Sequence, residues 1–184
     1  MTATIALLRG SPRPHGLTVL LAKAITHAIG DRLIIRDVAI TDLPLYDPDH
    51  DGDDRPAQWT AFRDAVKGCQ GVLFVTPEWN RSVPGGLKNA IDVGSRPFGR
   101  GIWAGRPTAV VTQSPGGVGG FGCNHALRQS LVHLDAPVLA QPEMYVGGLS
   151  ADKFGADGAT SDAGLAKLLS SFADKYVAWV QRLA

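Results

Sequence analysis

The sequence is short of cysteine and has no excess of charge of either sign, and each shortage excludes a class of protein. Its two cysteines, Cys69 and Cys123, form no C-x-x-C pair, so neither a disulfide framework nor a zinc cluster is indicated. The 18 basic and 17 acidic residues leave a formal net charge of +1. This balance gives no general attraction to nucleic acid or to an anionic membrane, so partners must be inferred from a local site.

Long apolar runs are also missing. The apolar stretches are only as long as a strand, and the first residues lack the basic start and long apolar core of a signal peptide. We therefore expect a cytoplasmic protein that does not enter a membrane. With 184 residues, 45% of them hydrophobic, the chain is long enough for one well-buried core, and we expect a single domain over residues 1–184.

Short apolar segments alternate with segments of helical periodicity. Strands are expected at 4–8, 33–38, 71–75 (ended by Thr76) and 107–112, with a fifth starting at 135–139. Helices are expected at 17–28, from Pro56, from Pro84, at 126–134 and at 165–183. The acidic, proline-containing residues 41–56 have no periodicity and are expected to form a solvated surface loop. This alternation predicts an α/β fold, a parallel sheet with helices on both faces.

Three polar loops follow predicted strands: RGSPRPHG at 9–16, TPEWNRSVPGG at 76–86 and QSPGGVGGFG at 113–122. We call them the first, middle and late loops. In an open α/β sheet, ligands bind outside the carboxyl ends of the strands, where such loops converge. We therefore expect the three loops to form one site.

The first loop has the features of a phosphate cradle. Gly10, Ser11 and Gly16 permit close backbone approach, Arg13 and Thr18 can donate hydrogen bonds, and the loop leads into a helix amino terminus. The alternative is a Gly-Pro turn that contains an arginine.

The middle loop, between Pro77 and Pro84, offers an aromatic face together with carboxylate and amide groups. The simpler interpretation is a strand-to-helix turn with one solvent-exposed tryptophan.

The late loop contains G-x-G-x-x-G at residues 117–122, the pattern of a dinucleotide site, but it lies several residues beyond its strand. Its glycines fit close approach to a flat ring better, and a flexible glycine-rich loop remains the alternative. A Walker lysine motif is absent after the first strand, which argues against phosphoryl transfer. Cys123 lies beside a predicted helix start, which favours a thiolate, but the sequence assigns it no catalytic partner.

At this point the chain resembles a known family, the flavodoxin-like NAD(P)H-dependent FMN reductases, which include the bacterial quinone and chromate reductases. The resemblance covers most of the chain. It is carried by Gly10-Ser11-x-Arg13, Pro44-Leu45-Tyr46-Asp47, Thr76-Pro77-Glu78-Trp79-Asn80 followed by SVPGGLKNAID at 82–92, and Leu127-Arg128-Gln129 before Pro142-Glu143. It implies a doubly wound five-stranded parallel sheet with strand order 2-1-3-4-5.

The resemblance also implies the cofactor site. FMN is expected, with its phosphate at the first loop and its ring between the middle and late loops. The residues expected to bind it are Ser11, Arg13, His15, Gly16, Leu17, Thr18, Pro77, Glu78, Trp79, Asn80, Ser114, Pro115, Gly116 and Gly117. Gly16 and Thr18 stand where the family usually has Ser and Asn, Trp79 where it has Tyr, and Gly122 where an Arg is common. These departures bear on FMN affinity and on the choice between NADPH and NADH.

By resemblance, the chain is a ping-pong oxidoreductase. It would pass a hydride from NADPH or NADH to FMN and then electrons to a quinone, azo compound, metal oxyanion or free flavin. No side chain is expected to act as acid, base or nucleophile, and no metal is expected. The family forms homodimers or homotetramers, with Arg128 and Glu143 as a candidate inter-subunit pair. Two alternatives remain, a non-catalytic FMN electron carrier and a dehydrogenase that uses the late loop.

Overall fold

The computed structural model describes residues 2–184 and is built around a five-stranded parallel sheet. The strand order is β2-β1-β3-β4-β5, which confirms the order expected from the resemblance. The strands are β1 (Thr4–Arg9), β2 (Ile34–Asp37), β3 (Gly71–Pro77), β4 (Thr108–Gln113) and β5 (Met144–Val146). Each strand pairs in parallel with its neighbours.

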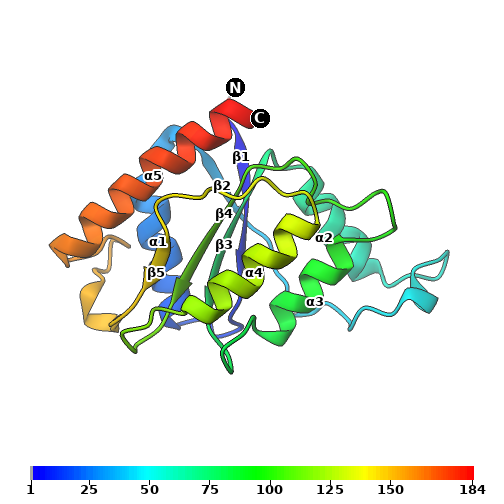
Figure 1. Ribbon diagram of the computed structural model, residues 1–184, viewed down its shortest axis with the longest axis horizontal. Helices are drawn as coiled ribbons and strands as arrows, with labels where there is room; N and C mark the ends of the chain where they lie inside the picture. The colour runs from blue at the N-terminus through cyan, green and yellow to red at the C-terminus, as the bar shows by residue number, and fades with distance from the viewer. Residues whose placement is uncertain (1) are drawn as a thin grey trace.

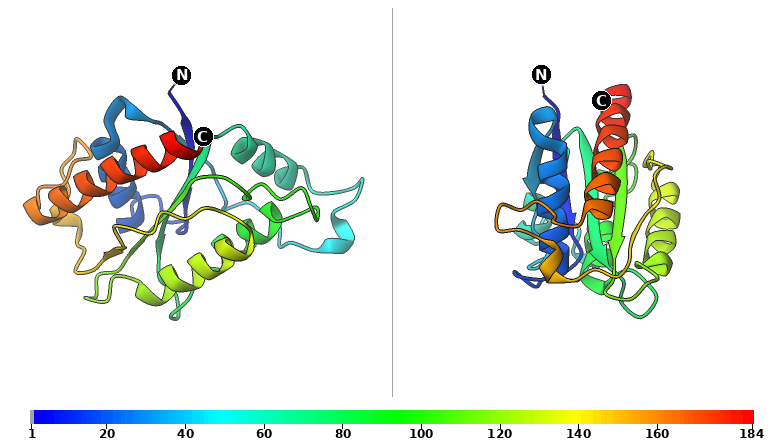
Figure 2. Two further views of the ribbon diagram at one scale, coloured as in Figure 1. Left: turned by 45° about the horizontal axis from the view of Figure 1, so that its top comes forward. Right: turned by 90° about the vertical axis from the view of Figure 1, so that its left-hand side faces the viewer.

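Helices cover both faces of this sheet (Figure 1). One face carries α1 (Leu17–Ile29) and α5 (Ala163–Leu183), and the other carries α2 (Ala57–Lys67), α3 (Gly85–Gly94) and α4 (Phe121–His133). The right-hand view of Figure 2 looks onto the face of the sheet that α1 and α5 cover. Short 3₁₀ turns occupy Gly30–Arg32, Pro48–His50 and Ala151–Lys153. Among residues 2–184, none of the helices combines the length and the apolar character needed to span a bilayer.

Two hydrophobic cores explain the continuous apolar strands. Leu7 and Val75 point toward α1 and α5, whereas Leu8 and Phe74 point toward α2, α3 and α4. Because a strand alternates its side chains between faces, a strand buried on both faces must be apolar at every position. The expected inward positions of α2, including Trp59, are buried in the second core.

Three predicted boundaries were wrong. β3 does not end at Thr76, because Thr76 and Pro77 pair with Thr112 and Gln113 of β4. The fifth strand is not at 135–139, where Val138 makes only an isolated bridge to Thr108 and Pro137 has no amide to donate. β5 instead begins at Met144. α4 begins at Phe121 instead of Ala126, because its first turn is stabilised by a contact from the middle loop, described below.

The acidic residues 41–56 are not all solvated, as the sequence had suggested. The Asp51 carboxylate accepts two hydrogen bonds from the Arg63 guanidinium, at 2.8 and 2.9 Å, and both side chains are buried. Arg63 also donates to the backbone carbonyl of Val93 at the end of α3. This ion pair fixes the 41–56 segment against α2 and α3.

Candidate functional site

The carboxyl ends of β1, β3 and β4 lie side by side at one edge of the sheet, the lower edge in Figure 1. The strand register pairs Arg9 with Val75, Val75 with Val111, and Pro77 with Gln113. The first, middle and late loops therefore start from adjacent positions, as the sequence predicted. Contacts of these loops with β3 and with the starts of α1 and α4 define the site further.

The first loop leads into a helix whose amino terminus is open. Gly16 precedes α1, and within residues 2–184 no side chain caps that end of the helix. The loop returns close to β3, because the Gly10 amide donates to the Val75 carbonyl at 2.9 Å and a Cβ at Gly10 would overlap the Thr76 side chain. Free amides at a helix amino terminus attract anions. With Arg13 and His15 exposed beside it, this end of α1 is suited to a phosphate.

Thr18 lies in the first turn of α1, behind the first loop. Its side chain is only 1% exposed, and its Oγ1 accepts a hydrogen bond of 3.1 Å from Nε2 of Gln113, the last residue of β4. Sequence reasoning missed Gln113, although a polar residue that ends an apolar strand just before a glycine loop is a signal for a site. Among buried side-chain nitrogen and oxygen atoms of residues 2–184, only Gln113 Oε1 has no partner.

The middle loop forms a tight hairpin turn that presents Trp79. Asn80 and Arg81 both adopt left-handed backbone conformations, with φ of 49° and 62°. Trp79 and Ser82 exchange two backbone hydrogen bonds across this turn, at 2.9 and 3.0 Å. Two consecutive positive φ angles define a type I′ turn, which Asn80 tolerates but which is strained for Arg81. The Trp79 side chain is 65% exposed, so its face is available beside the site.

Glu78 links the middle loop to the start of α4. Its Oε2 accepts a hydrogen bond of 3.0 Å from the backbone amide of Cys123, and its Oε1 accepts one from Arg81. A carboxylate at this position caps the helix and complements its dipole. Gly122 permits the contact, since a Cβ there would lie 2.8 Å from the Arg81 carbonyl oxygen and 3.0 Å from Glu78 Oε2.

Cys123 is not a nucleophile in this environment. Its side chain is fully buried, and burial together with the Glu78 carboxylate raises the pKa of the thiol to about 12. The thiolate is the reactive form, so the helix start does not activate this cysteine. Cys69 is also buried and acts as a small apolar residue of the core.

The late loop divides into an exposed part and a packed part. Residues 115–117 are exposed, and the Ser114 hydroxyl accepts a hydrogen bond from the Gly116 amide at 3.0 Å. Gly119 and Gly120 have φ of 66° and 80° and lie against Tyr145 and Thr112. The later glycines of G-x-G-x-x-G thus serve packing within the chain. Only the exposed part is free to contact a ligand.

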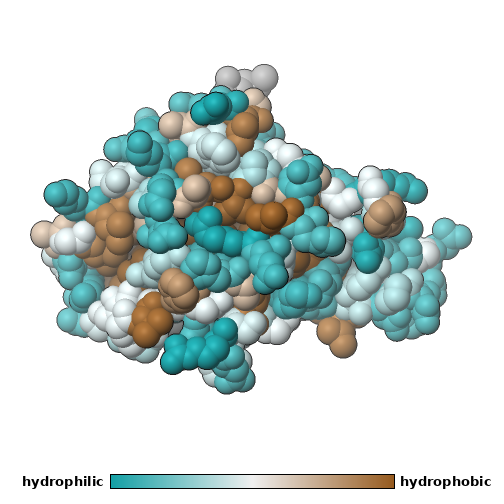
Figure 3. Space-filling view, viewed as in Figure 1, coloured by the Kyte–Doolittle hydropathy of each residue, from teal (hydrophilic) through white to brown (hydrophobic). Residues whose placement is uncertain are grey.

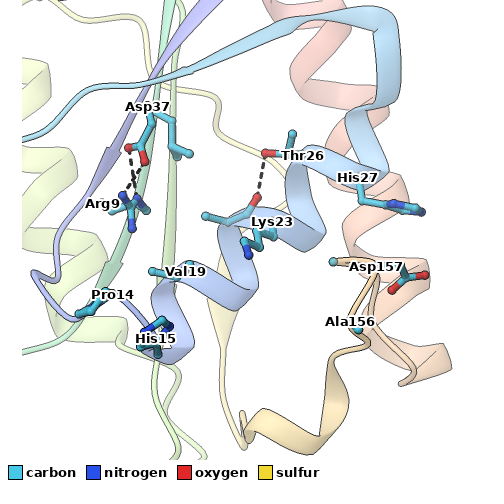
Figure 4. Close-up of a pocket in the computed structure, with 13 residues that line it drawn as sticks. Arg9, Pro14, His15, Val19, Lys23, Thr26, His27, Asp37, Ala156 and Asp157 are labelled. Atoms are coloured by element: carbon cyan, nitrogen blue, oxygen red, sulfur yellow. Dashed lines mark hydrogen bonds and ion pairs between the residues drawn. The ribbon is translucent and has the colours of Figure 1, made fainter.

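A cavity of about 750 Å³ lies beside this site and is distinct from it (Figure 4). It follows the surface of α1 from the Arg9–Asp37 ion pair to Asp157, which lies in the segment before α5. It touches the first loop through Pro14 and His15, and its lining includes no residue of the middle or late loop. The site at the strand ends is itself open to solvent, because Arg13, Trp79 and residues 115–117 are exposed.

The residues at this edge fit FMN. The open end of α1 suits a phosphate, the exposed Trp79 and residues 115–117 suit a flat ring, and the orphaned Gln113 Oε1 suits a hydroxyl donor between them. Among residues 2–184 there is no group of three or more His, Cys, Asp or Glu side chains that could hold a metal ion.

Comparisons with known proteins identify the family of this chain. Residues 3–150 match the family model of the NADPH-dependent FMN reductases. A quinone reductase of Pseudomonas putida is 47% identical over 97% of this chain and 95% of its own length. A 2-hydroxy-1,4-benzoquinone reductase of a Burkholderia species is 38% identical over 98% of both chains.

A solved structure shows the same fold. The flavoenzyme NAD(P)H:(acceptor) oxidoreductase FerB of Paracoccus denitrificans superimposes with a TM-score of 0.93, at 35% identity and 99% coverage of both chains. This chain therefore belongs to the NADPH-dependent FMN reductase family and is an oxidoreductase that uses FMN and NAD(P)H.

Proposed function

We propose that this protein reduces quinones with NAD(P)H through FMN held at the three loops. The observation that carries the proposal is the convergence of the uncapped α1 amino terminus, the Trp79 turn and the exposed part of the late loop at one edge of the sheet. The names of the relatives support a quinone as the acceptor. Azo compounds, metal oxyanions and free flavin are further acceptors to be tested.

In this proposal the loops bind different parts of FMN. The phosphate lies at the amino terminus of α1, and the ring lies between the middle and late loops. The phosphate-binding residues are Ser11, Arg13, His15, Gly16, Leu17 and Thr18. The ring-binding residues are Pro77, Glu78, Trp79, Asn80, Ser114, Pro115, Gly116 and Gly117. Because α5 packs into the same core as β1 and α1, we also propose that residues 1–184 act as one FMN-binding domain.

When bound, FMN supplies the redox chemistry, taking a hydride from NAD(P)H and passing two electrons to the acceptor. The chain's own task is to bind the two ends of the cofactor and leave one side open. Glu78 and Cys123 are held in contacts within the chain, so neither is free to act as a general base or nucleophile. An open edge serves the nicotinamide and the acceptor in turn, which is a ping-pong mechanism.

The visible spectrum of the purified protein tests this proposal. We expect the absorption bands of FMN, loss of those bands when NADPH or NADH is added without oxygen, and their return when a quinone follows. Initial rates at varied NAD(P)H and quinone should give parallel double-reciprocal lines. Flavin that neither nicotinamide bleaches would indicate an electron carrier, and a colourless protein that binds NAD would indicate a dehydrogenase.

We also propose that the chain forms homodimers or homotetramers through α4. Phe121, His125 and Val132 lie on one exposed side of that helix, and the exposed side chain of Phe121 packs against His125 and Tyr145. Figure 3 shows apolar areas among polar ones on the molecular face that α4 crosses. Arg128 donates within its own chain to Asn124 and to the Leu139 carbonyl, which leaves only part of its guanidinium for Glu143 of another subunit.

A further inference from the structure

Two hydrogen-bonding groups behind the first loop have no partner within the described chain. Gln113 Nε2 donates to Thr18 Oγ1 at 3.1 Å, and both side chains are more than nine-tenths buried. Gln113 Oε1, an acceptor, is orphaned, and the hydroxyl hydrogen of Thr18 has no acceptor among residues 2–184. Leaving a buried polar atom without a partner destabilises the fold, so such a pair requires an explanation.

The position of the Gln113–Thr18 pair in the fold suggests what binds to these groups. Thr18 lies in the first turn of α1, whose amino terminus is uncapped, and Gln113 is both the last residue of β4 and the first residue of the late loop. The pair thus joins the phosphate end of the proposed FMN site to the loop that contacts the ring. The ribityl chain, which carries hydroxyl donors, connects these two ends of FMN.

We propose that Gln113 binds the ribityl–phosphate chain of FMN and orients Thr18 for the same purpose. Because Nε2 donates to the Thr18 oxygen, the Thr18 hydroxyl hydrogen points away from Nε2 and is left to donate to a phosphate at the open end of α1. Gln113 Oε1 accepts a hydrogen bond from a ribityl hydroxyl. This inference rests on the FMN site proposed above and adds a residue to it.

Flavin binding to Gln113→Met, Thr18→Val and the double variant tests the inference. Met keeps the unbranched shape and the length of Gln and removes both hydrogen bonds. The dissociation constants of FMN and riboflavin are measured by fluorescence quenching after the bound flavin has been removed. Riboflavin has the ribityl chain but no phosphate. Its binding therefore reports the contact of Gln113 with the ribityl chain without the contact of Thr18 with the phosphate.

Thr18→Val should weaken FMN binding about tenfold and leave riboflavin binding unchanged, because a hydrogen bond to a charged group is lost. Gln113→Met should weaken both flavins, and FMN by the larger factor. In the double variant the loss for FMN should be smaller than the product of the two single losses, because the Thr18 contact depends on Gln113. If Gln113 and Thr18 only stabilised the fold, their replacement would change the dissociation constants of FMN and riboflavin by the same factor.

Thr108→Val is the matched control. Thr108 is a buried residue at the opposite end of β4, and its hydroxyl donates to the Arg106 carbonyl. Its removal should leave both dissociation constants unchanged. If Gln113→Met binds FMN as tightly as the unmodified chain, the inference is overturned.

Weaker FMN binding with unchanged riboflavin binding would overturn the ribityl contact and support the orientation of Thr18 alone. Should Gln113→Met fail to fold, Thr18→Val decides the orientation step, because unchanged FMN binding in that variant would overturn it. If the unmodified chain binds no FMN, the proposed function itself fails, which is a different result.

Discussion

At the scale of single residues, Trp79 combines high exposure with a tightly fixed backbone. Its flanking turn is closed by two hydrogen bonds to Ser82 and contains two left-handed residues, yet its side chain has few contacts with the rest of the chain. Strained backbone is retained where the surroundings determine it, and it concentrates at functional sites. The turn therefore fixes the position of the Trp79 backbone and leaves the face of the indole ring free for a ligand.

Replacing Trp79 by Tyr should change flavin affinity or acceptor preference without affecting the fold. Because the side chain is largely exposed, the free energy of unfolding should stay within about 0.5 kcal/mol of the unmodified value. Urea unfolding, FMN titration and quinone kinetics measure the three quantities. A variant with unchanged affinity and unchanged acceptor preference would remove Trp79 from the site.

Trp103→Tyr is the control for this experiment. Trp103 is 1% exposed, donates to the Ile91 carbonyl at 3.0 Å and lies directly against Gly94. Its replacement leaves a void and an unpaired carbonyl, so we expect a loss of stability of about 2 kcal/mol or more. The comparison separates an effect on the site from an effect on the core.

At the scale of elements, the segment between β2 and α2 is held by the ion pair of Asp51 and Arg63. The Tyr46 hydroxyl also donates to Asp51, at 3.3 Å. Hydrogen bonds from Arg63 hold the pKa of the Asp51 carboxyl below its usual range, against the opposing effect of burial. Breaking one side of a buried pair is costly because the other charge stays buried and unpaired.

Arg63→Met should therefore lower the free energy of unfolding by about 3–5 kcal/mol near neutral pH. The double variant Arg63→Met with Asp51→Leu should lose less, because no isolated charge remains. Urea unfolding of the three proteins measures both differences. Equal losses in the single and double variants would contradict a role for the ion pair.

The Asp51–Arg63 ion pair also predicts that the free energy of unfolding depends on pH. A carboxyl whose pKa is lowered by folding contributes its full stabilisation above the pKa of the unfolded chain, about 3.9 for Asp. That contribution is lost as the pH falls through the lower pKa of the folded protein. The gap in stability between the unmodified chain and Arg63→Met should be largest above about pH 5 and shrink below about pH 4. A gap that stays constant down to pH 3 would contradict this assignment.

At the scale of the whole molecule, the exposed side of α4 predicts the oligomeric state. Phe121 and Val132 are 49% and 70% exposed, so a charge at either position costs the folded monomer little. If α4 forms the subunit interface, Val132→Glu should convert an oligomer to a monomer, since a glutamate would be buried there without a partner. Gel filtration with light scattering measures the mass.

Leu45→Glu is the control for that prediction. Leu45 is 82% exposed and lies in the 41–56 segment, away from α4. The same change of charge should leave the mass unaffected. If the unmodified chain is itself a monomer, or if Val132→Glu keeps the mass of the oligomer, the interface on α4 is excluded.

The sequence by itself determined the succession of strands and helices along the chain, because burial produces a local pattern of apolar residues. Apolar runs mark strands covered on both faces, and the helical spacing of α1 and α5 marks the face that meets the sheet. The first and middle loops could also be recognised from the sequence, since their glycine, proline and polar residues follow strands directly. The family resemblance supplied the strand order and the cofactor.

Only the tertiary structure decided which polar groups meet. Glu78 reaches the Cys123 amide 45 positions away, and Gln113 reaches Thr18 across 95 positions. The end of β3 was set by its neighbour β4, and the start of α4 by a cap from another loop. Periodicity records whether a side chain is buried, but a hydrogen-bonding partner depends on how distant segments are brought together. For that reason the sequence identified the three candidate loops, and the fold selected the contacts between them.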